Sequence, residues 1–222
     1  MIKEHKQYAV LGLGIFGSTI AKTLSDANCE VIAIDKDIES VQRLADTVTS
    51  AVKGDITDID VLRNAGVGEC DIAVVAVGSH LEESIMAVFN VRELGVPFVV
   101  AKAKNKRYME ILKKVGAHKV VRPEKEMGVV TAKSLLNDNI IERIAFDNDY
   151  SVVEINTPDI WINKTLIDLN LRDQYGINIL GIRRPNEKMN VTPSPDYILT
   201  KDDHIVLIAE SENLEKLNVL FK

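Results

Sequence analysis

Three glycines near the beginning of the chain have the spacing that binds a pyrophosphate. Gly12, Gly14 and Gly17 lie in "YAVLGLGIFGSTIAKTL", between an apolar run and a helical pattern. The first glycine permits a tight turn, the second lets phosphate approach the backbone, and the third lets the helix pack closely against the strand. The helix would begin around Ile15 and Phe16, and its free amides attract phosphate. The pattern predicts a dinucleotide site, the alternative being glycines kept for packing alone.

An acidic and a basic side chain follow the next predicted strand, in "VIAIDKD". Asp35 lies about 20 residues beyond the glycine loop, where a carboxylate binds the ribose hydroxyls of NAD. The same charge would repel a 2′-phosphate, so NADP is disfavoured. Lys36 adjoins Asp35 and is placed in the same predicted site.

Further candidates follow from strand ends, because open parallel sheets bind ligands beyond the carboxyl ends of their strands. We expect Asp55 to contact the adenine amino group or to cap the next helix. Lys102 would contact phosphate or remain a solvated charge. Glu124 would hold a divalent cation on a phosphate chain or cap the helix that follows. The residues at these strand ends are Asp55, Ile56, Gly78, Ser79, Lys102 and Glu124.

Catalytic motifs are missing from the sequence, including a serine-nucleophile elbow, a zinc-protease motif and a Walker loop. Hydride transfer would need an acid or base beside the nucleotide, and only His80 and Tyr108 are near candidates. We therefore expect a nucleotide sensor and no enzyme. The alternative is a small NAD-dependent oxidoreductase or epimerase, and a weaker third hypothesis is a nucleic-acid-binding redox repressor.

Apolar strands alternate with amphipathic helices through the first two-thirds of the chain. Such strands are buried on both faces, which predicts an α/β fold with a Rossmann-like, doubly wound parallel sheet. Gly66, Gly95 and Gly116 are expected to follow helix ends in the left-handed conformation, and Asp37 and Asp58 to cap helix starts. The predicted strands are residues 8–13, 30–34, 50–53, 71–77, 98–102 and 119–122.

The pattern changes after residue 125. Residues 126–144 read as one or two helices interrupted at 137–139, and alternating strands follow in "SVVEI", "INILGI" and "HIVLIA", with a last helix at 214–221. We expect three segments: a nucleotide-binding lobe at 1–125, crossover helices and a dimer linker at 126–147, and a small α+β lobe at 148–222. The apolar residues expected at the dimer surface are Met127, Val130, Leu135, Ile140 and Ile144.

Composition narrows the class of protein. The 222 residues carry a net charge of −6 without a basic stripe, which argues against a nucleic-acid partner. Cys29 and Cys70 form no Cys-x-x-Cys pair and are expected to be small buried side chains in a reducing cytosol. No apolar run approaches the roughly 20 residues that span a bilayer. We expect a cytoplasmic protein that reaches the inner face of the membrane only through a partner.

These motifs together resemble the RCK (regulator of potassium conductance) family, and more narrowly the cytosolic regulatory subunits of Ktr- and Trk-type potassium uptake systems. The resemblance spans essentially the whole chain, with a TrkA-N part and a TrkA-C part. The segments that carry it are "YAVLGLGIFGSTIAKTL", "VIAIDKD", "VKGDITD", "IAVVAVG", "VVAKAKN", "GAHKVVRPEKEMG" and "LIDLNLRDQYGINILGIRR".

The resemblance implies a gating subunit. It implies homodimers that build an octameric ring beneath a separately encoded membrane potassium-translocating subunit. The Rossmann lobe would bind ATP, ADP or NAD(H) and change the shape of the ring. Carried over by position, the phosphate loop is Gly12, Gly14 and Gly17, the ribose and adenine-side contacts are Asp35 and Asp55, and Lys102 and Glu124 lie at the rim, Glu124 where relatives place a divalent cation.

The resemblance also implies a cyclic di-AMP site between two C-terminal lobes. Arg172 could pair with phosphate in bidentate fashion, and Asn178 offers a donor and an acceptor to a base. The alternative is that Leu166 and Ile179 form dimer core and Arg172 is a solvated charge. The residues at the matching positions are Leu166, Arg172, Asn178, Ile179 and Pro193.

Ile15 departs from the family pattern. Ktr-type relatives often carry an arginine at this position, which reaches the nucleotide phosphates, and isoleucine cannot. Losing one charge-assisted contact costs roughly 1.5–3 kcal/mol. We therefore expect weaker discrimination between ATP and ADP, which favours a NAD-like ligand or control through the C-terminal lobe.

Overall fold

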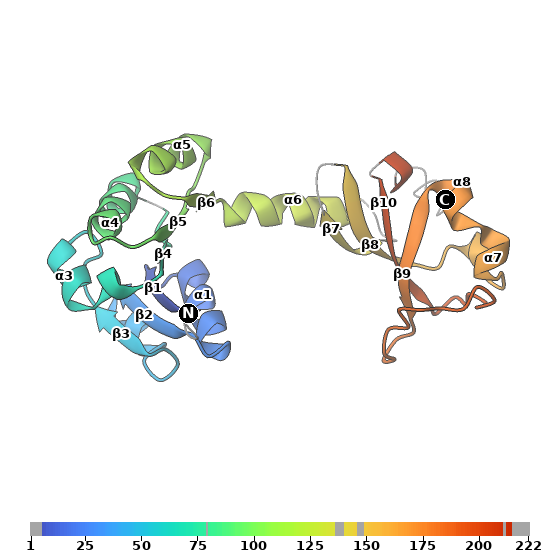
Figure 1. The fold of residues 1–222 in the computed structure, drawn as a ribbon, viewed down its shortest axis with the longest axis horizontal. Helices are drawn as coiled ribbons and strands as arrows, with labels where there is room; N and C mark the ends of the chain where they lie inside the picture. Colours follow the sequence, from blue (N-terminus) through green and yellow to red (C-terminus); the bar gives the residue numbers. More distant parts are fainter. Residues whose placement is uncertain (1–5, 79, 136–139, 146–148, 211, 215–222) are drawn as a thin grey trace. The chain divides into compact units, whose positions relative to one another are not determined.

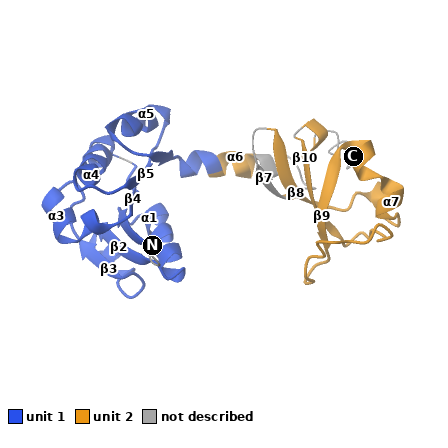
Figure 2. Ribbon diagram, viewed as in Figure 1, with its two compact units in different colours: residues 1–126 blue, residues 127–222 orange. Residues whose placement is uncertain are grey.

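The computed structural model describes residues 6–78, 80–135, 140–145, 149–210 and 212–214. Ser79 and most of the helix expected at 214–221 therefore lie outside the described residues. The chain divides into two compact units, residues 1–126 and 127–222, which Figure 2 shows in different colours. Each unit has its own sheet and its own core.

The first unit is built around a six-stranded parallel sheet in the order β3-β2-β1-β4-β5-β6 (Figure 1). All six predicted strands are present, although the first and fourth end two residues earlier than expected. Its strands are β1 (Gln7–Leu11), β2 (Glu30–Asp35), β3 (Ser50–Lys53), β4 (Ile72–Val75), β5 (Phe98–Lys102) and β6 (Lys119–Val121).

Helices cover both faces of this sheet. One core joins the sheet to α1 and α2, and includes Leu13, Ala21 and Leu44. The other joins it to α3, α4 and α5, and includes Leu62 and Leu112. The predicted Rossmann-like fold is confirmed. The helices are α1 (Ile15–Asp26), α2 (Ile38–Gln42), α3 (Ile59–Asn64), α4 (Leu81–Glu93), α5 (Lys106–Val115) and the short 3₁₀ turn η1 (Val67–Glu69).

The helices begin and end with the caps that the sequence predicts. Asp37 accepts amide hydrogens of Glu39 and Ser40, and Asp58 accepts that of Asp60. Gly66, Gly95 and Gly116 all have positive φ, of 84°, 85° and 120°. Neither cysteine forms a disulfide within the described residues, and Cys70 is buried as expected, whereas Cys29 is only partly buried because it lies in the connection between α1 and β2.

The second unit holds a four-stranded antiparallel sheet in the order β7-β8-β10-β9. Its core centres on Trp161, Ile205 and Leu207, each at most 1% exposed. Residues 212–214 are helical, and Leu214 closes this core. The elements are α6 (Pro123–Leu135), which crosses the boundary between the units, β7 (Ile140–Ala145), β8 (Tyr150–Asn156), η2 (Asp159–Trp161), α7 (Leu166–Leu169), α8 (Leu171–Tyr175), β9 (Ile177–Arg183) and β10 (His204–Glu210).

One prediction for this region is wrong. Residues 140–145 form a strand that pairs antiparallel with β8, where helix was expected through residue 144. The segment "IIERIA" is rich in β-branched isoleucine, which prefers a pleated surface, and the turn-forming "NDN" precedes it. Ile140 and Ile144 therefore belong to the small sheet and not to a helical face. Within the described residues, none of the helices combines the length and hydrophobicity that a bilayer-spanning segment requires.

Candidate functional site

The glycine loop lies at the point where the strand order of the sheet reverses. It joins the end of β1 to α1, and β4 is the neighbour of β1 on the opposite side from β2. In open α/β sheets such a switch point is the usual ligand crevice. The amides of Gly12 and Ala76 bond to the carbonyls of Ile34 and Leu11, at 2.8 Å each, which ties the loop to both flanking strands.

Each glycine of the loop meets a different steric constraint. Gly12 has φ +94°, and a Cβ there would lie 2.6 Å from the Cγ1 of Val77. A Cβ on Gly17 would overlap the carbonyl oxygen of Gly12. Gly14, by contrast, has no described atom within 4 Å of the place a Cβ would take. The backbone is thus open on the side where a pyrophosphate would approach, and no described side chain caps the start of α1.

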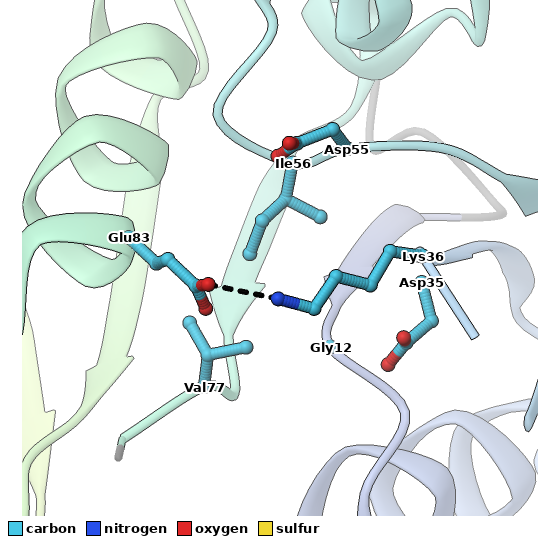
Figure 3. Close-up of a pocket in the computed structure, with 7 residues that line it drawn as sticks. All are labelled: Gly12, Asp35, Lys36, Asp55, Ile56, Val77 and Glu83. Atoms are coloured by element: carbon cyan, nitrogen blue, oxygen red, sulfur yellow. Dashed lines mark hydrogen bonds and ion pairs between the residues drawn. The ribbon is translucent and has the colours of Figure 1, made fainter. Parts of the chain in front are cut away.

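A small pocket opens beside this loop, at the carboxyl ends of β1 to β4 (Figure 3). Its volume is about 30 Å³, room for about one water molecule. It brings together five of the predicted nucleotide contacts and two residues that the sequence analysis missed. The lining residues are Gly12, Asp35, Lys36, Asp55, Ile56, Val77 and Glu83.

The two aspartates that line the pocket accept hydrogen bonds from backbone amides of the loops around it. Asp35 Oδ2 accepts the amide hydrogen of Leu13 at 2.6 Å, and Oδ1 accepts that of Asp37 at 2.8 Å. Since a carboxylate offers about four acceptor positions, two remain for ribose hydroxyls. Asp55 does not cap the next helix; it accepts the amide and hydroxyl of Thr57, and these bonds lower the pKa of its carboxyl.

An ion pair crosses the pocket. Lys36 Nζ lies 2.8 Å from Glu83 Oε1, and Figure 3 shows the two side chains extending toward one another between Ile56 and Val77. Glu83 Oε2 is 3.9 Å from Nδ1 of His80. Glu83 was not predicted as a pocket residue, because a glutamate in the first turn of a helix is already explained by its favourable interaction with the helix dipole. No local sequence feature indicates its contact with Lys36, which lies 47 residues away.

Lys102 and Glu124 meet each other outside this pocket. Their side chains form an ion pair of 2.6 Å. The stem of Lys102 covers Gly78, and its Nζ lies 5.7 Å from the ring centroid of Phe16. The structure therefore gathers Phe16, Gly78, Lys102 and Glu124 into a second cluster, while Ile15 projects from the loop with 91% of its surface exposed.

The ion pair between Lys102 and Glu124 should make the free energy of unfolding depend on pH in the acidic range. The hydrogen bond from Lys102 holds the pKa of the Glu124 carboxyl below its ordinary value of 4.5. Stability from this pair is therefore present above pH 4.5 and is lost as the pH falls through the lowered pKa. Because the Glu124 side chain is 69% exposed, we expect Glu124→Gln to cost less than about 1 kcal/mol at pH 7. Urea unfolding of both proteins should show that difference shrinking below pH 4.5; a constant difference would contradict the assignment.

An open groove of about 750 Å³ lies in the second unit. All five residues predicted for cyclic di-AMP line it: Leu166, Arg172, Asn178, Ile179 and Pro193. Arg172 Nε donates to Oδ1 of Asn178 at 2.8 Å, so the predicted phosphate and base contacts are hydrogen-bonded to each other. The sequence analysis missed Thr192, which adds a hydroxyl to the lining.

No metal centre formed by protein ligands alone is seen in the described part of the chain, where no three His, Cys, Asp or Glu side chains converge. Glu124 is paired with Lys102, as described above. A divalent cation at Glu124 would thus need most of its ligands from elsewhere, and phosphate oxygens suit Mg²⁺ in that way.

Comparisons with known proteins match both units. Residues 8–123 match the family model of the TrkA-N domain, and residues 150–222 that of the TrkA-C domain. The chain is 35% identical over 211 residues to Ktr system potassium uptake protein C of Bacillus subtilis, with 95% of each chain covered. It is 33% identical over 213 residues to Ktr system potassium uptake protein A of the same organism, with 96% of each covered.

Solved structures share the fold. The structure titled "GsuK Channel" superposes with a TM-score of 0.69 at 18% identity, covering all of this chain and 40% of that one. A second, titled "GsuK channel bound to NAD", has a TM-score of 0.64 at the same identity and coverage. The order of a parallel lobe followed by a small antiparallel lobe is therefore shared with these chains.

Proposed function

Since the chain belongs to the family of TrkA-N and TrkA-C domain proteins, with Ktr potassium uptake proteins as relatives along nearly its whole length, we propose that it is a cytoplasmic nucleotide-sensing subunit that gates a membrane potassium transporter or channel. Its class is potassium transport and not enzymatic catalysis, in agreement with the names of these relatives. The observation that carries the sensing role is the glycine loop at the switch point, with open space above Gly14.

Different residues of the first unit would contact the phosphates, the ribose and the adenine of a bound nucleotide. The amides at the start of α1 would hold the phosphates, Asp35 the ribose hydroxyls and Asp55 the adenine amino group. Lys102 would reach phosphate only after releasing Glu124, which would then be free to contact a phosphate-bound divalent cation. A nucleotide shifts gating only by binding one shape of the assembly more tightly than the other.

Calorimetric titration of the full chain with NADH, ADP and ATP tests this proposal. We expect saturable binding of at least one of them, with no loss of NADH absorbance in the presence of simple carbonyl compounds. Absence of binding by all three would contradict the sensing role. Turnover of NADH would instead favour the small oxidoreductase considered from the sequence.

For the second unit, we propose that the groove binds cyclic di-AMP between two copies of the chain. The support is the family resemblance together with the gathering of all five expected residues in one groove. Leu166 and Ile179 offer apolar surface to purine rings, and Arg172 offers a planar cation to a phosphate. Binding would require Arg172 to exchange its bond with Asn178 for one with the ligand.

Arg172→Ala is expected to weaken cyclic di-AMP binding about tenfold, because one charge-assisted hydrogen bond is lost. Calorimetry of wild type and variant measures the change. Lys188→Ala removes an exposed positive charge from the same unit at a position that does not line the groove, and is the matched control. Equal affinity loss in both variants would indicate a general charge effect and contradict the assignment of Arg172.

We further propose that α6 contributes to a homodimer and thereby to a ring. Large apolar side chains on α6 are exposed in the single chain: Met127 at 60%, Val130 at 49% and Leu135 at 75%. Apolar surface gathered in this way is typical of an association site. The expected segments, a lobe at 1–125, crossover helices and a dimer linker at 126–147 and a lobe at 148–222, stay a prediction, except that residues 140–145 pair with β8 in the small sheet. A chain that is monomeric by light scattering would contradict the ring.

A further inference from the structure

Glu83 forms an ion pair with Lys36, the one positively charged side chain among the described residues that line the nucleotide pocket. Among the residues lining it, three carry carboxylates, Asp35, Asp55 and Glu83, and Lys36 alone carries a positive charge. The hydrogen bond and charge of Glu83 are the largest causes that raise the pKa of Lys36, ahead of Asp55 and Asp35. The contact that carries this interaction joins Lys36 Nζ to Glu83 Oε1 at 2.8 Å.

Lys36 occupies a position that decides between two classes of dinucleotide. It follows Asp35 directly, at the end of the second strand. In dinucleotide-binding folds a carboxylate at this place binds the 2′-hydroxyl of the adenosine ribose, while a cation nearby accommodates a 2′-phosphate. This chain has both groups side by side, so selectivity depends on which of them is free to meet the ligand.

We propose that Glu83 is a specificity-determining residue of the nucleotide pocket, which withholds Lys36 from a 2′-phosphate and so favours dinucleotides with a free 2′-hydroxyl. Glu83 comes from the first turn of α4, on the far side of the pocket from β2, and draws the lysine across the cavity (Figure 3). Asp35 retains free acceptor positions for the hydroxyl, whereas the charge of the nearby ammonium is offset by the Glu83 carboxylate, which would also repel a phosphate placed beside it. This inference rests on the proposed nucleotide binding by the first unit.

The test compares NADH and NADPH as ligands of the full chain. In Glu83→Gln the lysine loses its charged partner and can pair with the added phosphate. We expect the ratio of the NADPH to the NADH dissociation constant to fall up to about fivefold, because an ion pair whose lysine side chain is 68% exposed contributes only weakly. NADH should still bind more tightly, because Asp35 is unchanged.

Two further variants separate this effect from a simple change of charge. Glu82→Gln removes the same charge from the adjacent, exposed position of α4, outside the pocket lining, and should leave the ratio unchanged. Adding Lys36→Gln to Glu83→Gln should cancel the gain for NADPH. Thermal unfolding of every variant checks that the fold is kept.

Each outcome has one meaning. Equal shifts in Glu83→Gln and Glu82→Gln, or a gain that survives loss of Lys36, would overturn the role of Glu83. Wild-type binding of NADH with an unchanged ratio in Glu83→Gln overturns this inference and leaves the sensing role standing. If neither NADH nor NADPH binds to wild type or to Glu83→Gln, the role of Glu83 is overturned, and binding of ADP or ATP to wild type then decides whether the sensing role stands.

Discussion

Nucleotide binding is expected to be lost on replacing Gly14 with alanine, while the protein remains folded. The added methyl group meets open space, and φ of −62° suits alanine, so unfolding free energy should change by less than about 0.5 kcal/mol. The methyl group would nonetheless stand where a pyrophosphate must touch the backbone. We expect calorimetry to show affinity for NADH or ADP reduced by about 100-fold, since several amide contacts lengthen together.

Gly17→Ala is the contrasting change in the same loop. Its methyl group would overlap the carbonyl oxygen of Gly12 and lie 3.0 Å from the Cβ of Ala76, so α1 has to move away from the sheet. Overpacking against the backbone should lower the free energy of unfolding by about 3 kcal/mol. Nucleotide binding should be lost as well. Loss of binding in Gly17→Ala alone, with Gly14→Ala binding normally, would show that the loop is only a packing device.

The second large effect is expected in the other unit, at Asp203. This carboxylate is 0% exposed. It accepts the amide of Thr200 at 2.7 Å, the hydroxyl of Tyr197 at 3.0 Å and Nε of Arg184 at 3.1 Å. Asp203→Ala leaves the Thr200 amide and the Tyr197 hydroxyl without their acceptor, and we expect it to destabilise this unit by about 3 kcal/mol.

Trp161 allows the loss to be measured in this unit. It is the single tryptophan of the chain, and it lies in the core of the second unit at 1% exposure. Urea unfolding followed by tryptophan fluorescence should therefore report the Asp203→Ala effect directly. Asp202→Ala, at the exposed neighbouring position, should change the midpoint little. Equal midpoints for the two variants would show that the buried contacts of Asp203 contribute nothing.

Local sequence was enough to predict the elements that form the first unit. Its strands are short, mostly apolar runs, and the cap residues Asp37 and Asp58 stand next to the helices that they begin. The glycine loop and Asp35 could be placed in one crevice because strand order in this fold follows from right-handed crossovers. The signals for these features all lie within a few residues of the feature itself.

Contacts between distant residues were not accessible in the same way. The pairing of Lys36 with Glu83 crosses the pocket, and that of Lys102 with Glu124 joins two elements outside it. Both depend on how far side chains reach in the folded chain, which the spacing of residues in the sequence does not encode. The strand at 140–145 was missed for a related reason. Its isoleucines fit either a helix face or a strand when read alone, and its strand pairing with β8 decides between them.

The placement of β7 bears on how the chain can be cut into fragments. The TrkA-C family model begins at residue 150, just at the start of β8, so a fragment cloned to that boundary would omit β7. The backbone of β8, which contains the run "SVVEI", would then become an unpaired edge, and such edges recruit other chains and aggregate. A soluble fragment of this lobe should therefore begin before residue 140.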